Sequence, residues 1–200
     1  MIVLGIDPGT ASTGYGLVQC LRSRLRALEQ GVIRTQAATP LERRLSEIHA
    51  RVGDLLDSHA PDAIAIEELY FGANVRTAFA VGQARGVVLL AAGQRGVSTC
   101  SYTPQQVKAA VCGHGAAGKD QVGRMVARLL ALADPPEPDH AADALAVAIC
   151  HLNREPLARA VPAAPGSGGA GPAQAGARPA RAGARMKGAG APAEGAGARG

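Results

Sequence analysis

Two acidic residues of this 200-residue sequence each stand at the end of an apolar segment. Carboxylates placed in this way could hold a metal ion. Asp7 follows the run Ile2–Ile6, and Glu67 follows Ile64–Ile66. Burial of an unpaired carboxylate is unfavourable by several kcal/mol unless a cation or hydrogen-bond donors meet it. An acid at the end of a buried strand is therefore unusual, and here there are two.

A third acid and an imidazole come from a helix expected over 139–152. Asp143 lies in an otherwise apolar, alanine-rich stretch, and His140 precedes it by three residues, so the two share a helix face. The alanines permit a close approach of this helix to a sheet. Three carboxylates and an imidazole form an oxygen-rich site suited to Mg²⁺ or Mn²⁺. Two ions about 3.5 to 4 Å apart would stabilise the attacking and leaving oxygens of a phosphodiester.

Each of these residues also has a purely structural explanation. Asp7 precedes a Pro-Gly pair and could be only a turn former. Glu67 and Glu68 could be solvated acids at a strand end. A histidine in a first helical turn is ordinary, and only the spacing of His140 from Asp143 makes it a candidate ligand.

Two further residues keep more than one interpretation. Asp139 is better interpreted as the N-cap of the last helix than as a ligand. Lys119 follows Gly118 just before a helix, where it could contact a phosphate or serve only surface solubility.

The elements that position these groups follow from the hydrophobic pattern. Extended segments at Ile2–Asp7, Thr13–Gln19 and Leu25–Ile33 have tight connections and predict an antiparallel meander. A helix with apolar residues three or four apart follows, with Thr39 as its predicted cap and Pro40 at its first position. The rest predicts a strand at 63–66, a helix at 74–93, a strand at 97–101, and helices at 104–112, from 122 and at 139–152. The order βββαβαβααα predicts an α/β fold, a mixed central sheet of about five strands flanked by helices.

Composition divides the chain in two. Residues 1–155 carry 15 Lys and Arg against 15 Asp and Glu, whereas residues 156–200 carry 6 against 1, so the net charge of +5 lies in the tail. We predict one folded domain at 1–155 and a disordered, basic tail rich in Gly, Ala, Pro and Arg at 156–200. The tail's cations could serve solubility or weak DNA tethering.

Cysteine usage and hydropathy bound the location. The four cysteines have neither a metal-ligand spacing nor a dense disulfide pattern, which predicts reduced thiols in a cytoplasmic protein. The longest apolar runs fall far short of the ~20 residues that a membrane-spanning helix needs. We therefore expect no association with a membrane.

The glycine-rich segment from Gly5 to Gly16 supports a second hypothesis. Its Asp-x-Gly-Thr sequence at a hairpin is also the phosphate-loop pattern of actin-like ATPases and sugar kinases. That function needs a second, similar domain to close over the nucleotide, and a body of about 155 residues has no room for one.

The chain resembles the RuvC family of Holliday junction resolvases, which have a ribonuclease-H-like fold. The resemblance rests on five segments spread over residues 1–151 in the family's order: GIDPGTASTGYG from Gly5, AIEELYFGAN from Ala65, GQARGV from Gly82, YTPQQVKAAVCGHGAAGKDQV from Tyr102 and DHAADALAVAICH from Asp139. It implies a homodimer that binds a four-way DNA junction and makes symmetric nicks, using water activated by a divalent metal and no nucleotide cofactor. It also implies cooperation with the RuvA and RuvB branch-migration proteins.

The resemblance also assigns roles to residues. It implies that the metal-binding carboxylates are Asp7, Glu67 and Asp143. Tyr70 matches an aromatic residue that stacks on a base near the junction. Apart from the resemblance, we expect the neighbouring Phe71 to fill the core or contact a partner subunit. The basic positions near the scissile phosphate match Lys108 and Lys119.

One departure from the family pattern concerns the metal. Many members have a fourth Asp where this sequence has His140. Neutral imidazole binds Mn²⁺ better than Mg²⁺, which leaves the metal preference open. A non-catalytic junction-binding module is a further hypothesis, but it would not require Glu67 and Asp143 in apolar settings.

Overall fold

The computed structural model describes residues 1–68 and 75–160. In this part of the chain one sheet has five strands in the order β3-β2-β1-β4-β5. The strands are β1 (Ile2–Asp7), β2 (Ser12–Leu21), β3 (Arg24–Arg34), β4 (Ala63–Glu67) and β5 (Ser98–Tyr102). The helices are α1 (Leu41–His59), α2 (Val75–Arg95), α3 (Pro104–Cys112), α4 (Lys119–Leu130) and α5 (Asp139–Ala160). The predicted element order is confirmed.

The strand pairing makes the sheet mixed. Strands β1, β2 and β3 form the predicted antiparallel meander, and β4 and β5 run parallel to β1. Ile6 is paired with Ile66, so the carboxyl ends of β1 and β4 lie at the same edge of the sheet. Asp7 and Glu67 each follow that pair by one residue, which brings them side by side.

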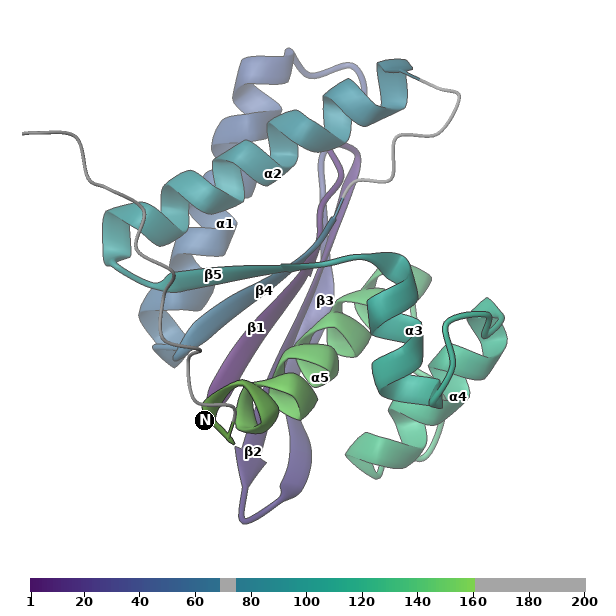
Figure 1. Ribbon diagram of the computed structural model, residues 1–200. Helices are drawn as coiled ribbons and strands as arrows, with labels where there is room; N and C mark the ends of the chain where they lie inside the picture. Colours follow the sequence, from purple (N-terminus) through teal and green to yellow (C-terminus); the bar gives the residue numbers. More distant parts are fainter. Residues whose placement is uncertain (69–74, 161–200) are drawn as a thin grey trace, which may run out of the picture. The chain divides into compact units, whose positions relative to one another are not determined.

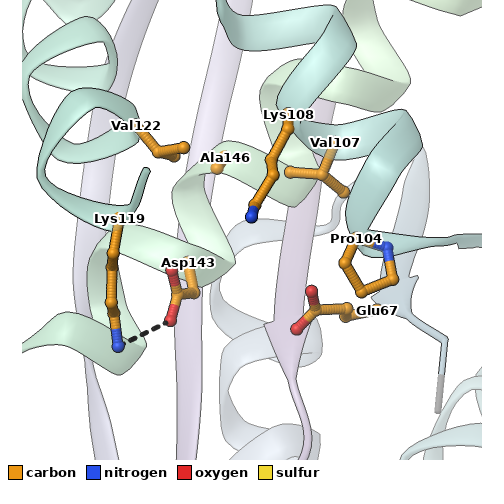
Figure 2. A pocket seen from close by; sticks show the side chains of 8 residues that line it. All are labelled: Glu67, Pro104, Val107, Lys108, Lys119, Val122, Asp143 and Ala146. Atoms are coloured by element: carbon orange, nitrogen blue, oxygen red, sulfur yellow. Dashed lines mark ion pairs between the residues drawn. The ribbon is translucent and has the colours of Figure 1, made fainter. Parts of the chain in front are cut away.

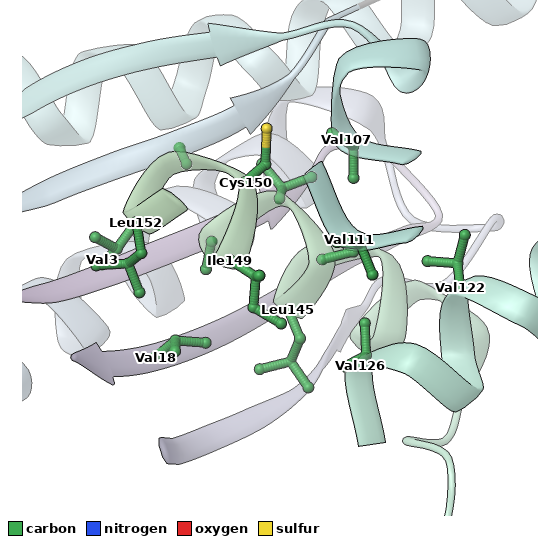
Figure 3. Packing of buried hydrophobic residues seen from close by; sticks show 14 of the residues in the cluster. Val3, Val18, Val107, Val111, Val122, Val126, Leu145, Ile149, Cys150 and Leu152 are labelled. Atoms are coloured by element: carbon green, nitrogen blue, oxygen red, sulfur yellow. The ribbon is translucent and has the colours of Figure 1, made fainter. Parts of the chain in front are cut away.

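Alternation along the strands separates two hydrophobic layers. On one face, Leu4, Ile6, Ile64 and Ile66 pack against α1 and α2. On the other face, Val3, Val18 and Ala65 pack against α3, α4 and α5, as Figure 3 shows for the second layer. Figure 1 shows the two groups of helices on opposite faces of the sheet. Residues one step beyond Ile6 and Ile66 therefore face the α5 layer.

Two predicted helix starts differ in outcome. The predicted capping role of Thr39 is wrong: Pro40 is itself the N-cap, no side chain caps α1, and the Pro40 carbonyl accepts the first helical hydrogen bonds. A proline lacks an N–H but has a carbonyl, so it satisfies this position. At α3 the pattern gives a complete capping box, in which Thr103 and Gln106 exchange side-chain to backbone hydrogen bonds.

Helix α5 is longer than predicted. It continues past 152 to Ala160, so it includes the first residues of the predicted tail, and residues 161–200 lie outside the described part. Among the helices that the structure describes, none combines the length and the apolar character that crossing a membrane requires.

Candidate metal centre and active site

Helix α5 lies directly on the meander because glycines leave room for it. A Cβ at Gly5 of β1 would overlap the carbonyl oxygen of Ala144, and a Cβ at Gly14 of β2 would overlap that of His140. Any larger residue at these two positions would push the helix away from the sheet. The glycine-rich segment therefore determines how close the α5 side chains come to the strand ends.

This approach brings His140 and Asp143 to Asp7. The His140 Nδ1 donates a hydrogen bond of 2.6 Å to Oδ2 of Asp7, whose side chain is only 16% exposed. One ligand atom each from Asp7, His140 and Asp143 lies within 4.8 Å of the others. The predicted i,i+3 relation of the two helical residues thus produces a cluster of three potential metal ligands.

Glu67 faces Asp143 across a pocket of about 200 Å³ that both residues line (Figure 2). Burial is the largest of the causes that raise the pKa of the Glu67 carboxyl to about 7, and the neighbouring charges of Asp7 and Asp143 contribute to the same rise. Burial also raises the pKa of Asp143, opposed by the nearby Lys119. Three carboxylates are therefore crowded in a partly buried place, where a bound cation would relieve their repulsion.

The donor set fits a divalent cation. Carboxylate oxygens from Asp7, Glu67 and Asp143 are the ligands that Mg²⁺ and Mn²⁺ prefer, and the imidazole of His140 is acceptable to Mn²⁺. Two strands and one helix supply these groups, so their spacing depends on rigid elements.

Two lysines lie around the same pocket. Lys108 of α3 extends into it between Glu67 and Asp143, as Figure 2 shows. The Lys119 Nζ lies 3.0 Å from Asp139 Oδ2 and 3.5 Å from Asp143 Oδ2. The hydrogen bond to Asp139 is the main reason that the pKa of Lys119 is raised. Both predicted basic residues thus adjoin the acidic cluster.

The prediction that Asp139 caps α5 is wrong. Asp139 is the first helical residue, and the carbonyl of Pro138 accepts the hydrogen bond from Ala141 that opens the helix. The Asp139 carboxylate is instead paired with Lys119. The spacing of Lys119 and Asp139 in the sequence does not indicate that they pair, because the two residues belong to different helices.

Sequence reasoning also missed Arg85 in α2. This side chain donates to the backbone carbonyl of Glu67 at 3.3 Å and to Ser101 Oγ at 2.6 Å. The one feature of the sequence that could have indicated a role for Arg85 is its positive charge within the GQARGV segment, on a predicted helix that is otherwise mostly apolar. Tyr70 and Phe71 lie outside the described residues, so their roles stay predictions.

Comparison with known proteins gives consistent matches. Residues 3–151 match the family model of crossover junction endodeoxyribonuclease RuvC. The RuvC protein of Moorella thermoacetica is 52% identical over 156 residues, which cover 78% of this chain and 93% of that relative.

Solved structures agree with the sequence relatives. The structure of Thermus thermophilus RuvC has 40% identity and a TM-score of 0.75, with coverage of 79% of this chain and 97% of that one. A T. thermophilus RuvC structure in complex with a Holliday junction substrate has 38% identity and a TM-score of 0.73, with coverage of 78% and 96%. The predicted ribonuclease-H-like fold is thereby confirmed. The chain belongs to the RuvC family of crossover junction endodeoxyribonucleases.

Proposed function

We propose that this protein is a divalent-metal-dependent endonuclease that resolves four-way DNA junctions by paired, symmetric nicks in recombination and repair. The observation that carries the proposal is the convergence of Asp7, His140 and Asp143 at the strand ends, with ligand atoms within 4.8 Å of one another. The family match over residues 3–151 supports the choice of a junction as the substrate.

The acidic cluster has the composition needed for phosphodiester hydrolysis. A bound divalent ion supplies positive charge for the developing phosphate oxyanion and lowers the pKa of bound water. Asp7, Glu67, His140 and Asp143 would hold that ion, or two ions. Lys108 and Lys119 lie beside the cluster, where their ammonium groups would neutralise the scissile phosphate.

The identity of the metal is proposed from the ligand types. Three carboxylates are compatible with both Mg²⁺ and Mn²⁺, whereas the imidazole of His140 favours Mn²⁺. We propose that both ions support nicking and that Mn²⁺ does so at lower concentration.

A homodimer follows from the need for two nicks. Each protomer has one acidic cluster, so symmetric cleavage requires two copies. Helix α2 presents Phe79 at 69%, Leu90 at 55% and Leu89 at 38% exposure, which supports it as the surface that a second copy covers. Leu90→Glu should then convert a dimer to a monomer in analytical ultracentrifugation, whereas Leu28→Glu, on the edge strand β3, should leave it dimeric.

Partners and location are proposed from the family. We propose cooperation with the RuvA and RuvB branch-migration proteins, as the family membership suggests. We propose the cytoplasm as the compartment, because the relatives come from bacteria. The basic tail at 156–200 would add weak, salt-sensitive contacts to DNA.

One assay tests the proposed activity. The full chain is incubated with a labelled mobile four-way junction in Mg²⁺, in Mn²⁺ and in EDTA, with a linear duplex of the same sequence as the control substrate. We expect paired nicks at symmetric positions with either metal, none in EDTA, and no cleavage of the duplex. Retardation of the junction without nicks in both metals would instead identify a non-catalytic binding module.

A further inference from the structure

Arg85 joins the ends of two neighbouring strands. Its Nη2 donates to Ser101 Oγ of β5 at 2.6 Å, and its Nη1 donates to the backbone carbonyl of Glu67 at the end of β4 at 3.3 Å. Ile66 is the residue paired with Ser101, so the guanidinium spans the last pairs of this parallel ladder. A single planar group with donors in fixed directions is well suited to hold two acceptors at once.

Arg85 reaches Glu67 and Ser101 from the face of the sheet opposite the acidic cluster. Helix α2 packs with Ala84 and Val88 against the layer that contains Ile66. The Glu67 carboxylate lies on the other face, in the pocket with Asp143. The hydrogen bonds described for Arg85 therefore go to the Glu67 backbone and to Ser101, on the face away from the carboxylates.

The end of β4 needs such support. Glu67 is held beside two like charges, Asp7 and Asp143, so repulsion acts on the strand end that carries it. On the β5 side, the N–H of Glu68 donates to the Tyr102 carbonyl at 2.8 Å. Arg85 adds a second restraint at the Glu67 carbonyl, and the two together limit movement of the Glu67 backbone.

We propose that Arg85 is a positioning residue that holds the Glu67 carboxylate in the geometry needed for metal binding. This inference rests on the proposed metal-dependent function and adds to it a residue that acts through Glu67. Replacement of a residue that orients a metal ligand without contacting the metal typically lowers metal affinity or activity by about 10–100-fold.

The test compares Mn²⁺ affinity, measured by isothermal titration calorimetry on the full chain, with nicking rate and melting temperature. Arg85→Gln should weaken Mn²⁺ binding and slow nicking, each by about 10–100-fold. Arg85→Lys should recover part of both, because an ammonium can still donate to one of the two oxygens. Arg95→Gln is the matched control, since Arg95 lies on the same helix and pairs with the exposed Asp57.

A merely structural role for Arg85 makes a different prediction. It would lower the melting temperature of Arg85→Gln and leave the Mn²⁺ affinity of the folded protein equal to that of the wild type, which would overturn the proposal. If Arg85→Gln does not fold, the Mn²⁺ affinity of Ser101→Ala is the deciding measurement, because this variant removes only one of the two hydrogen bonds of Arg85. A weaker Mn²⁺ affinity in Ser101→Ala supports the proposal, and an unchanged affinity overturns it.

Failure of the proposed function is distinguishable from failure of this inference. A wild-type protein that neither binds Mn²⁺ nor nicks a junction would remove the basis of both. A wild type that does both, with Arg85→Gln equal to it, refutes the role of Arg85 alone.

Discussion

The Nδ1 of His140 donates a 2.6 Å hydrogen bond to Oδ2 of Asp7, although 133 residues separate the two in the chain. A carboxylate oxygen accepts, so Nδ1 is the ring nitrogen that carries the hydrogen in this bond. Asp7 thereby restrains the ring orientation of His140 and holds the imidazole beside the acidic cluster.

Replacement of His140 should change the metal preference. His140→Asp adds a negative oxygen ligand, so the ratio of nicking rates in Mg²⁺ and Mn²⁺ should shift toward Mg²⁺. His140→Ala should reduce the rate in both metals by on the order of 100-fold.

His49→Ala is the control for this series, because His49 lies on α1 and bonds only to Gln94 among the described contacts. An alanine variant of His140 with the wild-type rate and metal preference would show that His140 is an ordinary residue of the first helical turn.

The three carboxylates should be needed for nicking and not for junction binding. Asp7→Asn, Glu67→Gln and Asp143→Asn each remove charge that holds the metal, so each should slow nicking by about 1,000-fold or more in saturating metal. Gel retardation in EDTA should show junction affinity close to that of the wild type. Asp54→Asn, an exposed residue of α1, is the matched control. A near wild-type rate in any one of the three would remove that residue from the ligand set.

Glu67 should make metal-free stability depend on pH. Its pKa is raised from 4.5 to about 7, so the folded state binds a proton more tightly than the unfolded state. Stability is therefore fullest below pH 4.5 and is lost as pH rises through 7, by about 3 kcal/mol from this group. Urea unfolding in EDTA at pH 5 and pH 8 should show Glu67→Gln gaining stability relative to the wild type at the higher pH.

Saturating Mn²⁺ should reverse this effect, because the cation compensates the charge that Glu67 acquires. Glu47→Gln, an exposed residue of α1, is the control and should show equal differences from the wild type at both pH values. If Glu67→Gln also differs from the wild type by the same amount at pH 5 and pH 8, the Glu67 carboxyl is not crowded by other charges in the folded protein.

Gly14→Ala should damage the site without touching a ligand. The added Cβ would overlap the backbone of His140, so the first turn of α5 must move away from β2. We expect a loss of about 1–3 kcal/mol in unfolding free energy, together with weaker Mn²⁺ binding. Gly123→Ala on α4 is the matched control, because its Cβ would come no closer than 3.8 Å to Pro135 and should stabilise the helix by about 0.5–1 kcal/mol. Equal effects of the two substitutions would contradict the close approach of α5.

Tyr70 and Phe71 are predicted to differ in role. Tyr70→Ala should slow nicking or blur its sequence preference more than it weakens junction binding, since a stacked base contributes about 1–3 kcal/mol to positioning. Phe71→Ala should instead lower the melting temperature. Cleavage mapping and thermal unfolding check the pair, and the reverse outcomes would exchange the two roles.

The sequence alone predicted the elements and the residues proposed for the site. Apolar runs that end in Asp7 and Glu67, and the spacing of His140 and Asp143, are local patterns with periods of two and 3.6 residues. Such periods identify strands and helices and show which side chains share a face. They were enough to predict the meander, the strand that carries Glu67 and the helix that carries Asp143.

Only the tertiary structure decided how these elements meet. From the sequence, the segment from Gly5 to Gly16 suggested a phosphate loop as one hypothesis. Only the tertiary structure shows that a Cβ at Gly5 or Gly14 would overlap the backbone of α5. The pairing of Lys119 with Asp139 and the bridge from Arg85 to Glu67 join separate elements. Contacts of this kind depend on which strands become neighbours and which face each helix covers, and no local period in the chain encodes either.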